Sequence, residues 1–251
     1  MTAPARPLTL LTFAPMVDSE TTRLLCRWYG IEHAEADHLF GWVSILTLLH
    51  GGYGRVPLLY GKGLHLSGPR PVVDRYDPLA VLGRRLLPDW PDTAAVDADW
   101  EAYNGPFALA VATFAYYHLL PSRALMAPTF AGSVPPAEAS IVPVIYPLLR
   151  ELFSLLLRLS PAKAQAAGEH IRTVFAAVDR RLADGRPFLS GDRLTLGDIA
   201  LAGASAPLLQ PKGFGAQMPP VDKMPPEIRD FIGELRSHEA ARYVERVYAA
   251  I

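Results

Sequence analysis

The sequence of 251 residues predicts an α+β protein in two parts: a β-α-β-α-β-β-α arrangement followed by an all-helical part. Three observations predict this fold class. Short apolar runs typical of strands lie before residue 70. Residues 88–99 hold two prolines and four aspartates without an apolar period, as linkers do. The chain beyond them is mainly helical in its periodicity. We therefore expect domains over 1–87 and 100–251, joined by a linker over 88–99.

The elements of the first part follow from apolar runs and from the residues that interrupt them. The run LTLLTF, which precedes Pro15, predicts a buried strand, and Gly30 predicts the end of the next helix. Asp18 or Ser19 could cap that helix. Two apolar runs around Gly61-Lys62-Gly63 predict a hairpin. We expect, in order, strands over 8–13, 32–38, 56–60 and 64–66, and helices over 20–29, 41–50 and 71–87.

The second part consists of helical patterns separated by two loops. Residues 121–139 contain prolines and small residues, and residues 211–225 are rich in proline and glycine, so both are expected to be loops. The predicted helices cover 100–120, 140–159, 161–184, 195–210, 226–237 and 239–250.

Composition and charge exclude several classes of function. The net charge is −1 without a basic block, so nucleic acid is not an expected partner. The single cysteine, Cys26, permits no intramolecular disulfide, and the histidines lack the spacing of a metal site, so no metal is expected. Without a signal-like N-terminus or an apolar run of about 18 residues, we expect a cytoplasmic protein with no membrane partner. Half of the residues are hydrophobic, which suggests a subunit interface.

The most specific pattern is FLSGDRLTLGDIALAG over residues 188–203. Thr195 can cap a helix and Asp198, three residues later, can complete a capping box, while Leu194 and Ile199 can form a hydrophobic staple. The pattern closely resembles the capped, buried helix in the C-terminal domain of the glutathione transferase family. That resemblance implies structural roles for Thr195 and Asp198.

A second pattern, Gly54-Arg55-Val56-Pro57-Leu58-Leu59, places a proline at the start of an apolar strand. Such a proline lies at an ordinary strand start, or it forms a cis peptide. The segment resembles the family's (K/R)-V-P-x-L element, in which the proline is cis and the preceding residue pairs its backbone with the cysteine of glutathione. Residues 20–31 are also similar to the family's first helix. The resemblance spans roughly residues 8–250 and implies a thioredoxin-like N-terminal domain, with glutathione contacts at Arg55, Val56 and Pro57.

The group that would stabilise the glutathione thiolate has several candidates. The family places a serine, tyrosine or cysteine at the start of the first helix, and counting back from Arg23 puts that position near Met16, which has no donor to offer. Ser19 is the nearest hydroxyl, and it is either the catalytic donor or only the N-cap. The backbone N–H groups of Met16 and Val17 are alternative donors, and the Asp18 carboxylate would disfavour a neighbouring anion.

Two further parts of the site are expected from the resemblance. The family holds the γ-glutamyl group with an acidic residue followed by serine or threonine; here the acid is missing, and Ser67 and Arg70 are the candidates. Arg70 could bind a carboxylate bidentately. The substrate pocket should lie between the domains, with Tyr103, Phe107, Tyr116 and Tyr117 as candidates that could equally belong to the core.

The resemblance implies a glutathione transferase-like enzyme and a homodimer. Glutathione would be the co-substrate, and its thiol would attack a small hydrophobic electrophile. Two alternatives stay open. One is a non-catalytic binding or interaction protein with the same scaffold, and the other is a glutathione-dependent lyase or isomerase.

Overall fold

A computed structural model describes residues 8–88 and 93–251. Its sheet has the strand order β2-β1-β3-β4. The central strand β1 (Leu8–Thr12) pairs in parallel with β2 (His33–Asp37) and antiparallel with β3 (Leu58–Gly61). A hairpin then joins β3 to β4 (Leu64–Ser67). The strands β1, β3 and β4 follow apolar runs of the sequence, whereas β2 is the polar segment HAEAD. The predicted thioredoxin-like arrangement is confirmed.

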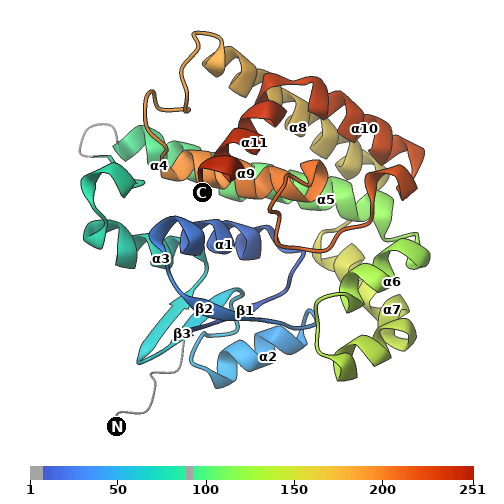
Figure 1. Cartoon of the computed structure of the whole chain (residues 1–251). Coiled ribbons are helices and arrows are strands. Elements are labelled where there is room, and N and C mark those ends of the chain that lie inside the picture. The colour runs from blue at the N-terminus through green and yellow to red at the C-terminus, as the bar shows by residue number, and fades with distance from the viewer. Residues whose placement is uncertain (1–7, 89–92) are drawn as a thin grey trace.

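Helices cover both faces of this sheet (Figure 1). The first, α1 (Val17–Tyr29), and α3 (Pro69–Tyr76) pack side by side on one face, and α2 (Trp42–Leu49) lies on the other. On its far side α1 packs against the C-terminal helices, so most of its residues are buried, the polar ones included. This sandwiched helix therefore connects the sheet to the second half of the chain.

The second half is helical, as predicted, and it is built around α9 (Leu196–Leu209), whose residues are all buried. Close contact with α1 requires glycine at one point, because a Cβ atom at Gly203 would lie 2.5 Å from Thr21 Oγ1. The other helices pack around or beyond α9: α4 (Thr93–Ala102), α5 (Ala108–Leu119), α6 (Arg123–Ala131), α7 (Pro136–Leu156), α8 (Pro161–Leu182), α10 (Pro226–Ser237) and α11 (Glu239–Ala250). A π-helical turn, Tyr103–Phe107, joins α4 to α5.

Several predicted boundaries of helices and loops are wrong. The helix expected over 71–87 ends at Tyr76 and gives way to a 3-10 turn over Asp77–Leu79, because Pro78 lacks the N–H that an α-helix would bond to the Asp74 carbonyl. The expected linker over 88–99 contains the start of α4 at Thr93, and its residues 89–92 lie outside the described part of the chain. The expected loop over 121–139 contains α6 and the first turn of α7.

Asp198 has the structural role that the sequence predicted. Its carboxylate accepts hydrogen bonds from the Thr195 amide (2.5 Å) and hydroxyl (2.8 Å), which completes the capping box of α9. It also accepts from the Leu189 amide at 2.9 Å and from the Tyr243 hydroxyl of α11. One buried carboxylate thus joins the start of α9, the preceding loop and the last helix.

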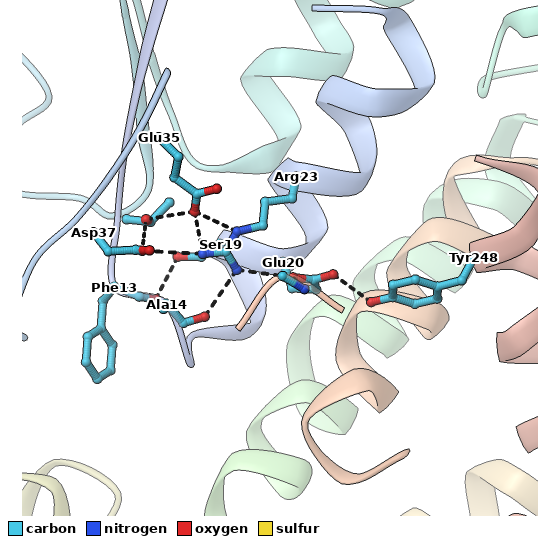
Figure 2. Close-up of polar contacts among 10 residues, drawn as sticks. Phe13, Ala14, Ser19, Glu20, Arg23, Glu35, Asp37 and Tyr248 are labelled. Atoms are coloured by element: carbon cyan, nitrogen blue, oxygen red, sulfur yellow. Dashed lines mark hydrogen bonds and ion pairs between the residues drawn. The ribbon is translucent and has the colours of Figure 1, made fainter. Parts of the chain in front are cut away.

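A second, partly buried polar network joins the sheet to the C-terminal helices (Figure 2). Arg23, in the middle of α1, forms ion pairs with Glu20 at 3.1 Å, Glu35 at 2.5 Å and Asp37 at 3.4 Å. Glu20 then accepts a hydrogen bond from the Tyr248 hydroxyl of α11 at 2.8 Å. Arg23 and Glu20 are buried and paired, whereas Glu35 lies at the surface end of the network, so the network fixes α1 between the two halves of the chain.

The helix α7 has an unusually apolar surface. By length and composition it is the helix within residues 8–88 and 93–251 that could cross a membrane, although a helix packed in a protein interior passes the same test. Val144, Leu148 and Leu155 are exposed on it, whereas Tyr146 and Phe153 are buried. The helix therefore contributes one side to the core and leaves an apolar side exposed.

Candidate functional site

Two cavities adjoin one another where the first strand leads into α1. The larger, which we call the polar cavity, has a volume of about 700 Å³ and lies against Val56 and the start of α3. The other, the apolar cleft, has a volume of about 380 Å³ and lies between the β1–α1 turn and the C-terminal helices. Both are lined by Met16, Asp18, Phe40 and Asn104. A ligand that occupies the polar cavity can therefore reach a second ligand in the cleft.

Val56 presents free backbone groups beside the polar cavity. The Val56–Pro57 peptide is cis, which confirms one of the two expected conformations. Val56 precedes β3 and forms no backbone hydrogen bond with another described residue. Its N–H and C=O are therefore available to pair with an extended peptide-like ligand.

The start of α3 offers few backbone N–H groups to an anion. Gly68 is its N-cap, with a φ of 84°. The first three helical residues are Pro69, Arg70 and Pro71, so only Arg70 has a backbone N–H there. Ser67 lines the cavity as expected, but its hydroxyl donates to the Gly52 carbonyl at 3.0 Å. It can still accept a hydrogen bond from a ligand.

The two arginines of the polar cavity differ in their partners. Arg70 pairs with Asp74 at 3.0 Å and with Asp97 at 2.7 Å, so its guanidinium is already neutralised. This pairing does not favour the expected bidentate contact with a ligand carboxylate. Arg55 also lines the cavity, is exposed, and has no ion-pair partner among the described residues. Arg55 is therefore the cation better placed to receive a carboxylate.

The structure of the β1–α1 turn shows that neither role expected for Ser19, catalytic donor or N-cap, is correct. The N-cap of α1 is Met16, without a side-chain cap, so Ser19 occupies the third helical position rather than the cap. Its side chain is buried, its hydroxyl donates to the Phe13 carbonyl at 3.0 Å, and it lines neither cavity (Figure 2). Ser19 is therefore not positioned to donate to a thiol in the site.

The backbone of the same turn determines which N–H groups are free to donate a hydrogen bond to a thiolate. The Met16 amide already donates to the Phe13 carbonyl at 3.0 Å. The amides of Val17 and Asp18 belong to the first turn of α1, where N–H groups have no partner within the helix. These two amides, together with the positive end of the helix dipole, are the donors that the turn can offer to an anion.

Asp18 is the ionisable side chain at the junction of the two cavities. It lines both of them. Burial raises the pKa of its carboxyl group above 3.8, and a hydrogen bond with the Asn104 side chain opposes this shift. Asn104 lies on the π-helical turn, and its Oδ1 atom is buried without a hydrogen-bond partner among the described residues.

The apolar cleft is bounded by aromatic residues from distant parts of the chain. The Phe153 ring of α7 stacks on Phe13 (5.7 Å between centroids) and on Tyr116 (4.8 Å), and it also contacts Phe40 (4.9 Å). Burial raises the pKa of Tyr116, so its phenol stays protonated and can only donate or accept a hydrogen bond. Aliphatic residues complete the cleft: Leu109, Leu119, Met126, Leu156, Leu157 and Met218.

Of the four aromatic residues expected in the substrate pocket, Tyr116 alone lines the cleft. Tyr103 and Phe107 are buried in contact with each other, and Phe107 also packs against Phe175. Tyr117 packs against His118 and lines neither cavity. The expectation is wrong for these three, because helical spacing does not show which side of a helix faces the core.

Several cleft residues were not anticipated from the sequence. Phe13 and Phe40 each follow a strand, at the edge of the sheet where the cleft opens, and this position was a signal that could have identified them. Phe153 had no comparable signal, because its role depends on how α7 packs. Within the described ranges, no group of three or more His, Cys, Asp or Glu residues is placed to hold a metal ion.

Comparisons with known proteins agree with this architecture. Residues 161–205 match the sequence profile described as "Glutathione S-transferase, C-terminal domain". Similar solved structures are a glutathione S-transferase from Sinorhizobium meliloti 1021 (17% identity, 95% of this chain and 91% of that one, TM-score 0.58) and the β-etherase LigF from Sphingobium sp. strain SYK-6 (16% identity, 95% and 98%, TM-score 0.57). A third is a theta class glutathione S-transferase from Xanthomonas axonopodis pv. citri with glutathione bound (18% identity, 94% and 96%, TM-score 0.53).

No curated protein sequence matches the chain significantly. At the identities of the solved structures, the likeness establishes the fold, which is that of glutathione S-transferases. The profile match covers part of the helical C-terminal half, and the chain as a whole shares the fold of these proteins, with a thioredoxin-like N-terminal part and a helical C-terminal part.

Proposed function

We propose that this protein with the glutathione S-transferase fold is a glutathione-dependent enzyme that joins the glutathione thiol to a small hydrophobic electrophile. The observation that carries the proposal is the shared wall of Met16, Asp18, Phe40 and Asn104 between the two cavities. Glutathione would occupy the polar cavity and the electrophile the apolar cleft. Their reacting atoms would then meet at the β1–α1 turn.

The residues of the chain contribute mainly by positioning. The free backbone groups of Val56 pair with the cysteine of glutathione, and Arg55 receives a carboxylate of the tripeptide. The sulfur then lies beside the first turn of α1, where the Val17 and Asp18 amides stabilise a thiolate. Holding both reactants in contact removes much of the entropic cost of a bimolecular step.

A non-catalytic binding protein is the second candidate function, and specific observations favour it. The thiol position lacks a hydroxyl, because Met16 lies there and Ser19 points to the Phe13 carbonyl. The start of α3 has lost two N–H groups to prolines, and Arg70 is paired with aspartates. A lyase or isomerase reaction would use glutathione in the same position as conjugation does. The chemical identity of the ligand in the apolar cleft therefore decides between these reactions.

Titration calorimetry with glutathione tests the proposal. We expect saturable binding by the wild-type protein and binding weakened about tenfold or more by Arg55→Gln, since a carboxylate would lose a charged partner. The matched control is Lys62→Gln, which removes an exposed cation in the β3–β4 turn that lines a different cavity. Absence of heat at millimolar glutathione in a folded protein would support the non-catalytic alternative.

The proposal also covers the cellular location, the subunit number and the partners of the protein. We propose a cytoplasmic homodimer without a metal cofactor, and with neither nucleic acid nor a membrane as a partner. The exposed apolar residues of α2 and α7, among them Trp42, Leu49, Val144 and Leu148, support association between subunits. Light scattering on the purified protein measures the subunit number directly.

A further inference from the structure

The apolar cleft contains a negative charge that its other walls do not explain. Among the described residues that line it, Asp18 is the one with a carboxyl group, and none carries a positive charge. No Lys, Arg or His of the described chain forms an ion pair with Asp18. The carboxyl group therefore faces an apolar cavity without a charged partner from the protein.

The start of a helix explains part of this arrangement. An acidic residue in the first turn of a helix contributes about 0.3–1 kcal/mol through the helix dipole. That contribution is available to a solvent-exposed carboxylate, so it does not account for the position of Asp18 in the wall of a cavity. Burial there raises the pKa of its carboxyl group, which means that the ionised form is less stable than in water.

Asn104 adds a second acceptor at the same place. It lines the cleft beside Asp18, and its Oδ1 atom is buried without a hydrogen-bond donor among the described residues. A carboxylate and an amide oxygen both accept hydrogen bonds and repel anions. The pair is therefore complementary to a ligand group that donates hydrogen bonds and carries positive charge.

We propose that the apolar cleft binds a small hydrophobic molecule with a basic nitrogen, whose ammonium group pairs with Asp18. The Phe13, Phe40, Tyr116 and Phe153 rings hold the apolar part of this molecule. This inference depends only on the lining of the cleft. If the protein also has the proposed function, the basic molecule is its substrate. The ammonium group of that substrate then offsets the repulsion between the Asp18 carboxylate and a neighbouring thiolate.

A matched ligand series tests the proposal without glutathione. 4-Phenylbutylamine, 4-phenylbutanol and 5-phenylpentanoate share one phenylbutyl part and differ in the charge of the terminal group. We expect calorimetry to show that the amine binds wild-type protein about tenfold or more tightly than the alcohol, equivalent to about 1.4 kcal/mol. The carboxylate should bind most weakly of the three.

The variant Asp18→Asn locates the charge responsible. It keeps the size of the side chain, and the ratio of amine to alcohol affinity should fall to about one. The matched control Asp192→Asn removes an exposed carboxylate that lines neither cavity, so the preference should be unchanged. Thermal melting of each variant confirms that it is folded.

Three results would overturn the proposal: equal affinity of wild-type protein for amine and alcohol, an amine preference that survives in Asp18→Asn, or no binding of any member of the series. The first comparison uses wild-type protein, so it stands even if the variant does not fold. Failure to bind glutathione in a separate titration would contradict the proposed function and leave this result intact.

Discussion

Single residues in the β1–α1 turn determine which chemistry the site can support. Counting from Arg23 predicts a thiol position near Met16, and Met16 lines both cavities. The sequence predicted a helix from Glu20, but the helix begins at Val17, and this earlier start puts Ser19 in the first turn, where its hydroxyl donates to the Phe13 carbonyl. The direction of a side chain at a helix start depends on the helical phase, which composition and spacing do not determine.

Cys26 provides a prediction at the same scale. The thiol is buried in α1, and burial together with the nearby Glu35 carboxylate raises its pKa to about 12. Because the thiolate is the reactive form, we expect no reaction with a thiol reagent at pH 8 in the folded protein. One equivalent should react in urea, and spectrophotometric titration of the released chromophore measures both. Rapid labelling of the native protein would contradict the buried position.

Individual elements were predictable where an apolar pattern coincided with a capping or turn residue. The strands β1, β3 and β4, the hairpin and the start of α9 all meet this condition, whereas β2, with the sequence HAEAD, has only a weak alternation. The helix α6 did not, because its buried residues Met126, Thr129 and Phe130 are few and Pro128 interrupts the helical pattern. The helix α4 similarly buries just Val96 and Trp100 at helical spacing. Tertiary packing stabilises both helices, and no local signal of the chain shows that packing.

The start of α9 carries a prediction about stability. Replacing Asp198 with Ala would remove the acceptor used by the Thr195 and Leu189 amides and by the Tyr243 hydroxyl. Buried donors left without partners cost about 1–3 kcal/mol each, so we expect the free energy of unfolding to fall by about 3 kcal/mol or more. Urea denaturation measures this change. The exposed control Asp192→Ala should change it by less than about 0.5 kcal/mol, and an equal effect of both variants would contradict the assigned role.

At the scale of the whole molecule, the partly buried network around Arg23 joins parts of the chain that lie far apart in sequence. The sequence identified an arginine in the middle of α1, but its three carboxylate partners come from α1 and β2, and Glu20 continues the network to α11. Periodicity does not predict such contacts, because they arise only when the two halves of the chain pack together. The same packing creates the two cavities, which explains why the site was harder to predict than the fold.

The hydrogen bond between Tyr248 and Glu20 tests the connection between the halves. Tyr248→Phe removes the hydroxyl that donates at 2.8 Å to a buried carboxylate. Hydrogen bonds to charged groups contribute about 1.5–3 kcal/mol, so we expect a loss of unfolding free energy in that range, measured by urea denaturation. The control Tyr53→Phe alters a side chain that is 88% exposed and should be nearly neutral. A neutral effect of Tyr248→Phe would show that the network does not stabilise the assembled fold.

The central claim is that glutathione and a hydrophobic ligand meet at the wall shared by the two cavities. The most direct test is a crystal structure of the protein grown with glutathione. The account predicts that the cysteine backbone of glutathione pairs with Val56 and that its sulfur lies beside the Val17 and Asp18 amides, facing the apolar cleft. Glutathione bound elsewhere, or with its sulfur turned away from the cleft, would contradict the claim.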